Sequence, residues 1–243
     1  MTGITLYQFP SSHYNEKARW ALDRKRVPHE RVSLMPGPHA PRMKRLTGRT
    51  QTPVLVDGDE VIAGSAEILA HLERRFPDPP LLPADPALRA RALEIAKRFD
   101  DEVGPAVRLA KFFEVLSADY VIRTFCAAKP PLVRAAYRAA FPVVSRVMKR
   151  SMQIDAEHAA AARERTRAAL DFVAKEGAAT GYLVGGAFTI ADLTAAALLM
   201  PALDVGEQPP PATDAERAWL ARWSDHPGAA WVREIYRRHR GGA

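Results

Sequence analysis

Residues 52–69 read Thr-Pro-Val-Leu-Val-Asp-Gly-Asp-Glu-Val-Ile-Ala-Gly-Ser-Ala-Glu-Ile-Leu, and this stretch decides the fold. Two short apolar runs, at 53–56 and 60–63, stand on either side of the Asp-Gly pair at 57–58. An Asp-Gly pair in this setting is a strong signal for a hairpin turn. Apolar residues then recur at helical spacing over 65–75. The stretch therefore predicts a β-hairpin followed directly by a helix.

A strand, a helix and a second strand precede this hairpin. Residues 4–9 read as a strand that Pro10 ends, 13–26 carry the apolar stripe of a helix, and 30–34 form a second short strand. A strand, a crossover helix and a second strand form a right-handed parallel unit. The hairpin adds antiparallel strands, so the sheet is expected to be mixed. Residues 1–82 are therefore predicted to form an α/β domain with a mixed four-stranded sheet.

The character of the chain changes after a proline-rich segment that begins at residue 77. Proline at this density ends helices and stiffens a spacer, so we place a linker at 83–90. Beyond it alanine and arginine dominate, and both are strong helix formers. Residues 91–243 are therefore expected to form an all-α domain. The predicted helices span 88–115, 117–127, 131–149 (kinked at Pro142), 153–175, 189–203, 214–223 and 228–239.

The sharpest helix start in this second part is Thr189-Ile190-Ala191-Asp192. A threonine at the cap with a carboxylate three residues later is a capping box, in which each side chain bonds the other's backbone amide. The carboxylate also lies at the positive end of the helix. We interpret this motif as one that starts a helix, and not as a site.

The composition excludes several classes of protein. The chain has 243 residues, of which 47% are hydrophobic and 26% charged, as in an ordinary globular protein. The lone Cys126 excludes a disulfide framework, a redox Cys pair and a cysteine-rich zinc module. We expect Cys126 to be a small buried side chain, and we expect no metal. A chain without paired cysteines suits a reducing cytoplasm.

Charge and hydropathy narrow the class of partner. No apolar run approaches the ~18–20 residues that a membrane span needs, and the first residues lack the pattern of a signal peptide. We therefore expect a cytoplasmic protein without a membrane contact. The net charge is +7. The basic side chains either serve only to solvate helix faces or also attract a small anionic ligand. The basic residues are dispersed among the helices without an aromatic platform, so nucleic acid is not expected as a partner.

Three positions offer groups that suit an anionic ligand. Ser12 and Ser65 each stand where a helix begins, and a serine there either caps the helix or presents its hydroxyl beside free amides. Thr52-Pro53 opens the first strand of the hairpin, where proline often marks a bend and sometimes a cis bond. A cis bond there would turn the backbone of Thr52 toward a ligand.

In their order and spacing these motifs resemble the glutathione S-transferase family, in its serine-type, bacterial-like cytosolic form. The resemblance covers nearly the whole chain and implies a thioredoxin-like first domain and a helical second domain. The family usually forms a homodimer, and glutathione is its co-substrate. The residues that carry the resemblance are Ser12, Lys17-Ala18-Arg19-Trp20-Ala21-Leu22, Thr52-Pro53-Val54-Leu55, Gly64-Ser65-Ala66-Glu67-Ile68 and Phe188-Thr189-Ile190-Ala191-Asp192.

By this resemblance Ser12 is the group that activates the thiol of glutathione. Its hydroxyl would donate a hydrogen bond to the sulfur and so lower the thiol pKa. The thiolate would then attack a small apolar electrophile. Ser11 is the next candidate. Tyr7 is excluded because the tyrosine-type classes of the family have their tyrosine directly before a Phe-Pro pair, where this chain has Gln8. Tyr7 is thus shifted by one residue, and such a shift turns a strand side chain to the opposite face. His13 is expected to be a solvated residue of the first helical turn.

The resemblance also implies which residues hold glutathione. Thr52 supplies backbone bonds beside a cis Pro53, and Ser65 and the amide of Ala66 hold the γ-glutamyl carboxylate. Lys44 or Gln51 would bind the glycyl carboxylate. Asp101 would bind the glutamyl amine, within one chain or across a dimer. The family commonly has Glu or Gln where this chain has Gly64. That loss of a charge-assisted hydrogen bond is expected to cost about 1.5–3 kcal/mol of binding free energy.

A second pocket is expected between the domains for the electrophile. Its candidate residues are Tyr14, Val107, Phe112 and Phe113. The stretch 116–154 looks longer than the family needs, and it enlarges the pocket, covers it or builds a dimer contact. The alternative function is a non-catalytic or weakly catalytic ligand-binding or regulatory protein on the same fold, because a fold hosts many functions.

Overall fold

The computed structural model describes residues 3–240, and its first part is a single sheet. Strands β1 (Ile4–Gln8), β2 (His29–Ser33), β3 (Val54–Asp57) and β4 (Glu60–Ala63) are ordered β2-β1-β3-β4. β1 pairs with β2 in parallel and with β3 antiparallel, and β3 pairs antiparallel with β4. The predicted mixed four-stranded sheet is confirmed.

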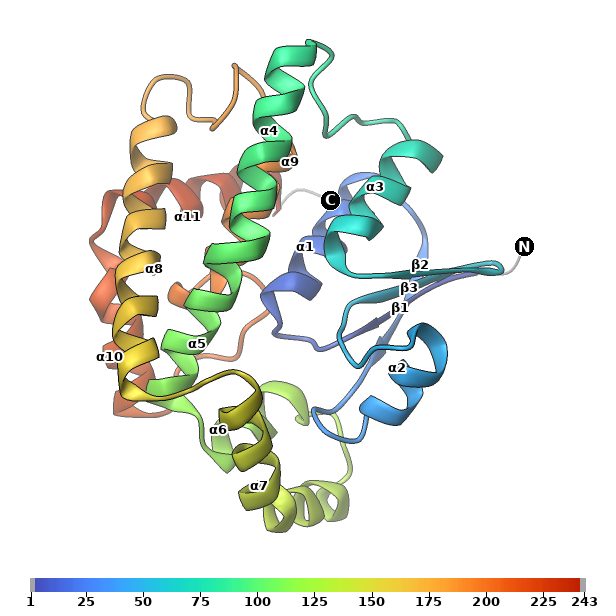
Figure 1. Ribbon diagram of the computed structural model, residues 1–243, viewed down its shortest axis with the longest axis vertical. Helices are drawn as coiled ribbons and strands as arrows, with labels where there is room; N and C mark the ends of the chain where they lie inside the picture. Colours follow the sequence, from blue (N-terminus) through green and yellow to red (C-terminus); the bar gives the residue numbers. More distant parts are fainter. Residues whose placement is uncertain (1–2, 241–243) are drawn as a thin grey trace.

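Helices cover both faces of this sheet (Figure 1). α1 (His13–Arg24) and α3 (Ser65–Arg75) lie on one face, and α2 (Ala40–Thr47) lies on the other. Strand side chains alternate between the two faces. Adjacent residues of β3 therefore pack on opposite faces: Leu55 packs into the large core, whereas Val54 packs with Met43 under α2.

Helix α2 is an addition to the predicted elements, because the sequence over 40–47 carries only a weak apolar pattern. A proline stands in its first turn, where the missing amide hydrogen is not needed. Gly48 ends the helix in the left-handed conformation with φ 73°. Met43 is its only buried residue, so a single apolar side chain attaches the helix to the sheet.

The rest of the chain is helical, as predicted. α4 runs through a π-helical turn, η1, into α5, so the expected first long helix is one rod with a wider turn in its middle (Figure 1). α7 continues through Pro142. The elements are α4 (Pro86–Arg98), η1 (Phe99–Val103), α5 (Gly104–Val115), α6 (Ala118–Phe125), α7 (Pro131–Ser151), α8 (Ala156–Glu176), α9 (Ile190–Leu199), η2 (Met200–Ala202), α10 (Asp214–Ser224) and α11 (Pro227–His239).

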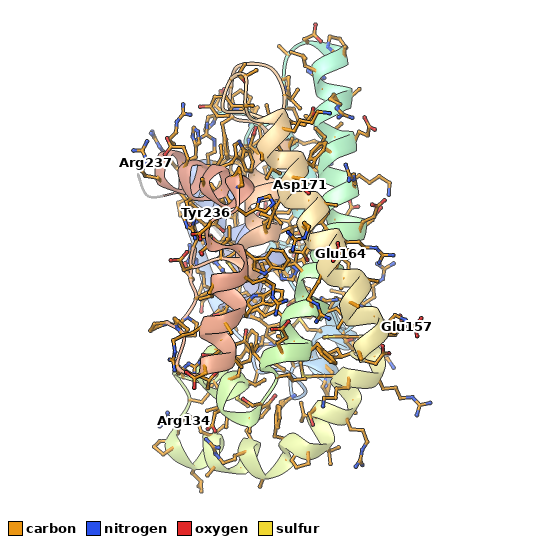
Figure 2. All side chains as sticks on the ribbon, turned by 90° about the vertical axis from the view of Figure 1, so that its left-hand side faces the viewer. Arg134, Glu157, Glu164, Asp171, Tyr236 and Arg237 are labelled. Carbon is orange, nitrogen blue, oxygen red and sulfur yellow. The ribbon has the colours of Figure 1, made fainter. Side chains whose placement is uncertain are left out.

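Most charged side chains of the helical domain are exposed on its outer surface. Glu157, Glu164 and Asp171 follow one another at intervals of seven residues along the exposed side of α8 (Figure 2). This spacing returns to the same side of a helix every two turns. No helix among residues 3–240 is long and apolar enough to cross a membrane.

Helix α9 is buried along its whole length, and its start is built around Asp192. The predicted capping box with Thr189 is present. The Asp192 carboxylate accepts from the amide of Thr189 at 2.8 Å and also from the amide of Leu183 at 2.7 Å. Burial raises the pKa of Asp192 to about 6, against the effect of these hydrogen bonds. Asp192 thus holds a preceding loop as well as its own helix.

We predict that Asp192→Ala lowers the free energy of unfolding by roughly 3 kcal/mol, because it removes the N3 side chain of the capping box and leaves two buried amides without an acceptor. The matched control is Asp85→Ala, which removes the exposed cap of α4 and is expected to cost about 1 kcal/mol. Denaturant unfolding of both variants measures the difference. Equal losses would contradict the role given to burial at Asp192.

Candidate functional site

Three segments that are distant in sequence meet at one edge of the sheet. Tyr7, near the end of β1, pairs with Val54 at the start of β3. Val54 in turn pairs with Ala63 at the end of β4. The segments that continue from these strands, namely the start of α1, Thr52–Pro53 and the start of α3, are therefore adjacent.

Two hydrogen bonds join these segments. The Gly64 amide donates to the Pro53 carbonyl oxygen at 2.9 Å, and the Asn15 side-chain amide donates to the Thr52 hydroxyl at 3.2 Å. The Thr52–Pro53 bond is cis, as the resemblance implies. The fold thus brings together the three positions at which the sequence predicts an anion site.

Ser12 stands at the N-cap of α1 with an uncommitted hydroxyl. Its backbone has the extended conformation of a cap, and its carbonyl accepts from the Glu16 amide at 2.8 Å. Its side chain makes no capping hydrogen bond. By contrast, the Ser11 hydroxyl donates to the Thr124 carbonyl of α6 at 3.4 Å. Of the two serines, Ser12 is the one whose hydroxyl can serve a ligand.

Tyr7 is committed to the opposite side of the sheet. Its hydroxyl accepts from the Arg42 guanidinium at 3.0 Å, and that guanidinium lies 4.5 Å from the centre of the ring. The next residue, Gln8, is buried and accepts from Arg19 on α1 at 2.7 Å. The alternation of side chains along β1 thus sends the tyrosine toward α2.

Asn15 is a site residue that the sequence analysis missed. It is fully buried, and its side-chain oxygen has no hydrogen-bond partner among the described residues. A buried polar atom without a partner costs free energy, so its presence beside Thr52 is informative. The available signal was a polar residue within the buried stripe of α1.

The start of α3 offers amides without a capping side chain. Gly64 is its N-cap, and no side chain caps this end. Gly64 has φ 102° and ψ 145°, a conformation that is essentially restricted to glycine. Ser65 is buried, whereas Ala66 is exposed. A helix start of this kind favours a carboxylate or a phosphate.

The other predicted glutathione contacts are at the surface. Lys44 on α2 and Gln51 before the hairpin are exposed. Asp101 is 58% exposed and forms an ion pair with Lys97. The acidic residue that turns inward from this part of the chain is its neighbour Asp100.

The first turn of α1 docks on the helical domain through three polar contacts. The Lys17 ammonium pairs with the Asp100 carboxylate at 2.6 Å, and the Tyr14 hydroxyl donates to the Asp100 carbonyl at 2.6 Å. The His13 ring bonds the Gly104 carbonyl at 3.0 Å. A Cβ at Gly104 would lie 2.5 Å from the Tyr14 hydroxyl oxygen, so only glycine allows this approach.

His13 is buried, 3% exposed, so the prediction of a solvated histidine is wrong. The reason is that the start of α1 faces another domain, which helical periodicity alone does not show. Burial lowers the pKa of His13 to about 3, and the charge of Arg108 acts in the same direction. The ring is therefore neutral near pH 7, and its Nε2–H donates, because a carbonyl can only accept.

This pKa predicts an acid-dependent loss of stability. The unfolded histidine binds a proton near its ordinary pKa of 6.5, while the folded one does not until about pH 3. The free energy of unfolding therefore falls as pH decreases from about 6.5 toward 3. His13→Gln, which can still donate to the Gly104 carbonyl, is expected to make this fall shallower.

The measurement is urea unfolding of both proteins at a series of pH values between neutral and mildly acidic. His13→Ala serves as the companion variant, since it also loses the hydrogen bond and is expected to be less stable at pH 7. A pH dependence in His13→Gln as steep as in the unmodified protein would contradict the account.

The four residues predicted to line a second-substrate pocket differ in their surroundings. Val107 and Phe112 are buried in the helical core, whereas Phe113 is 42% exposed. The Tyr14 hydroxyl is used at the domain contact. Helical spacing identified aromatic residues but could not show which of them face the core. Cys126 is buried, as predicted.

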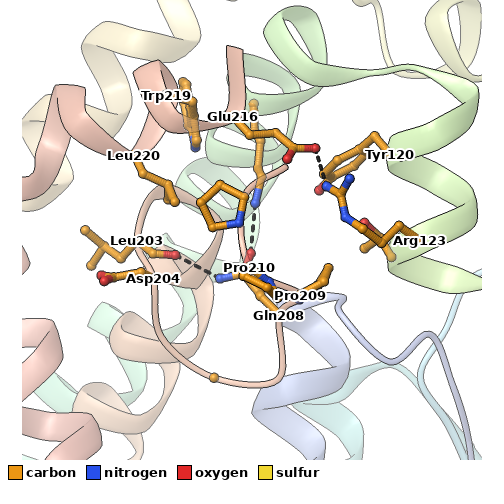
Figure 3. A pocket seen from close by; sticks show the side chains of 14 residues that line it. Tyr120, Arg123, Leu203, Asp204, Gln208, Pro209, Pro210, Glu216, Trp219 and Leu220 are labelled. Atoms are coloured by element: carbon orange, nitrogen blue, oxygen red, sulfur yellow. Dashed lines mark hydrogen bonds and ion pairs between the residues drawn. The ribbon is translucent and has the colours of Figure 1, made fainter. Parts of the chain in front are cut away.

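A cavity of about 360 Å³ lies instead within the helical domain, between α5, α6, α10 and the loop that follows η2 (Figure 3). Lys111, Arg123 and Glu216 bring charge to its wall, and Leu203 and Trp219 bring apolar surface. Its lining includes Thr124, whose carbonyl accepts the hydrogen bond of Ser11. The cavity therefore lies next to the start of α1.

No group of three or more His, Cys, Asp or Glu side chains in the described part of the chain could hold a metal ion. The chemistry that this geometry supports is recognition of an anion at two helix starts, with one serine hydroxyl available for a bound group.

Comparison with known proteins shows which family the chain resembles. The model of the glutathione S-transferase N-terminal domain matches residues 6–80, and that of the glutathione S-transferase C-terminal domain matches residues 131–227. Glutathione S-transferase 1 of Dianthus caryophyllus is 38% identical over 110 residues, which are 44% of this chain and 50% of the relative. FtsZ-localized protein A of Caulobacter vibrioides is 34% identical over 107 residues, 41% of this chain and 47% of the relative. The chain thus spans about half the length of these curated relatives.

Among solved structures, a glutathione S-transferase from Methylobacterium radiotolerans, in complex with glutathione sulfonate, superposes with a TM-score of 0.62 at 24% identity. The superposition covers 97% of this chain and 91% of that one. At this identity the likeness shows the shared fold.

Proposed function

Because the chain belongs to the glutathione S-transferase family, we propose that it activates the thiol of glutathione for attack on a small electrophile. The observation that carries this proposal is the uncapped Ser12 hydroxyl at the start of α1. It stands at the sheet edge where Thr52–Pro53 and the start of α3 also converge. Tripeptide binding and thiol activation would thus occur in one place.

The seat of glutathione follows from the three segments. We assign backbone hydrogen bonds of the cysteinyl part to Thr52, whose side chain Asn15 holds at 3.2 Å. Ser65 and the Ala66 amide would hold the γ-glutamyl carboxylate at the positive end of α3. Lys44 or Gln51 would meet the glycyl carboxylate. Asp101, which is exposed, would reach the glutamyl amine across a dimer.

The proposed step leaves the Ser12 proton in place. Ser12 donates a hydrogen bond to the sulfur, which favours the thiolate, and the thiol proton passes to solvent. The sulfur then forms a bond to an electrophilic carbon, and a leaving group departs with its electron pair. A serine hydrolase needs a base beside the serine. His13 is a poor base, because burial lowers its pKa to about 3.

Gly64 favours a second candidate function. The family commonly carries Glu or Gln at this position, and glycine supplies no partner to the γ-glutamyl ammonium. The loss corresponds to roughly tenfold to a hundredfold weaker binding. A weakly catalytic or non-catalytic protein that binds a ligand or a protein partner is the alternative. One similar protein is named for its localisation with FtsZ.

We also propose a homodimer that resides in the cytoplasm. The support is membership of the family, the lone cysteine, and apolar side chains on the surface. Val61 on β4 and Leu88 and Leu93 on α4 are each more than 40% exposed, at 43%, 41% and 45%. A second copy that covers them would remove this apolar area from water.

We predict that Ser12→Ala lowers turnover of glutathione with a reactive aromatic halide by about a hundredfold, the size of an effect expected when one stabilising donor is lost. Ser11→Ala is the matched control, since its hydroxyl bonds a backbone carbonyl of α6, and it is expected to keep most of the activity. Steady-state kinetics and unfolding curves of both variants separate catalysis from stability.

Two results would contradict this assignment. Full turnover in Ser12→Ala would remove Ser12 from the mechanism. Absence of heat and of a thermal shift with millimolar glutathione would remove the transferase proposal itself and favour the alternative function.

A further inference from the structure

The ammonium of Lys111 is buried at the wall of the cavity in the helical domain. Lys111 is 8% exposed, and its ammonium donates to the Gln208 side-chain oxygen at 2.8 Å. No carboxylate within the described residues forms an ion pair with it. Burying an ammonium without an opposite charge is costly. The nearest negative charge that acts on this cation is that of Glu216, which lies beyond ion-pair distance.

The acidic side chains around this cavity are already engaged. Glu216 forms an ion pair with Arg123 and accepts from the Thr213 amide at 3.3 Å. Asp204 pairs with Arg233 at 3.3 Å. The charge of Lys111 is thus the one at this wall that an incoming anion can neutralise.

A second polar group that lines the same cavity is the hydroxyl of Thr124. Thr124 is 5% exposed, and the side-chain hydroxyl nearest to it is that of Tyr120, whose pKa it acts to lower. A hydroxyl and an ammonium that line one cavity can both donate to a carboxylate.

Apolar side chains make up much of the remaining lining. Leu203, Trp219 and Leu220 contribute side chains, and three consecutive prolines at 209–211 form one side (Figure 3). The volume of about 360 Å³ falls within the range of small-molecule sites. Such a cavity suits a ligand with an apolar body and a single charged end.

The cavity also borders the proposed site of thiol activation. The Thr124 carbonyl accepts from Ser11, which precedes Ser12. One turn before Lys111 on α5 stands Arg108, whose charge contributes to lowering the pKa of His13. Arg108 forms no ion pair within the described chain, and its Nε is buried without a hydrogen-bond partner. The charges of Arg108 and Lys111 both act to lower the pKa of His13, so both cations of α5 lie near the start of α1.

We propose that this cavity binds the second substrate, and that this substrate is a small carboxylate with an apolar body whose charge is paired by Lys111. The proposal rests on the proposed transferase function for its chemistry, but the binding itself is independent of glutathione. It changes the expected electrophile from a purely apolar molecule to an anionic one, and it makes Lys111 the residue that determines this specificity.

The titration of Lys111 supports a pH-dependent affinity. Burial lowers the pKa of Lys111 to about 8, with the charge of Glu216 opposing the shift and that of Arg123 adding to it. The groups that face its ammonium also include Gln208 and the Tyr120 ring, whose centre is 5.8 Å away. Lys111 is charged below about pH 8 and loses its charge above. Affinity for a carboxylate should therefore fall about tenfold between pH 7 and pH 9.

The test is calorimetric binding of cinnamate and of its neutral amide, cinnamamide, to the full chain without glutathione. We expect cinnamate to bind at least tenfold more tightly at pH 7 and to lose this advantage by pH 9. Lys111→Met should abolish the preference by weakening the binding of cinnamate, and Lys111→Arg should retain it. Lys97→Met, at an exposed lysine, is the control.

Equal binding of the two compounds by the unmodified protein would overturn the proposal, as would a preserved preference in Lys111→Met. If Lys111→Met does not fold, the comparison of Lys111→Arg with the unmodified protein and the pH series still decide. A separate titration with glutathione distinguishes failure of the proposed transferase function from failure of the proposed carboxylate site. Cinnamate preference without glutathione binding would refute the transferase function alone, and glutathione binding without cinnamate preference would refute this proposal alone.

Discussion

The ion pair between Lys17 and Asp100 holds the sheet domain against the helical domain, and the position of the site depends on it. Lys17 is 1% exposed and the pair is 2.6 Å long. Removing one partner of a buried pair typically costs about 3–5 kcal/mol, because the other charge stays buried. His13 and Tyr14 bond the backbone at the same contact. The start of α1 is therefore fixed between the sheet edge and α5.

The far side of α1 is held by a second set of charges. Glu16 is buried and pairs with Arg19 at 2.7 Å and with Arg240, near the end of the described chain, at 2.8 Å. Arg240 also pairs with Asp23 at 2.8 Å. With polar contacts on both of its sides, α1 is a rigid support, and rigid elements place functional groups more precisely than loops.

The sheet, the hairpin and the capping box at Asp192 could be predicted because each depends on neighbouring residues: an Asp-Gly turn, alternating side chains, or a cap and its partner three positions on. The burial of His13, the role of Asn15 and the cation at Lys111 could not. Each of them arises where segments distant in the chain meet, and local periodicity carries no information about what a helix face will contact. For the same reason helical spacing could not show that Phe112 is buried while its neighbour Phe113 is 42% exposed.

The central claim is that Ser12 stabilises the thiolate of bound glutathione, and the pKa of the bound thiol tests it most directly. Titrating the ultraviolet absorbance of the thiolate in the glutathione complex measures this pKa. This pKa is expected to lie clearly below the ~8.5 of a free cysteine thiol in the unmodified protein, and to return toward that value in Ser12→Ala. A bound thiol that titrates as it does in free solution, or equally in both proteins, would contradict it.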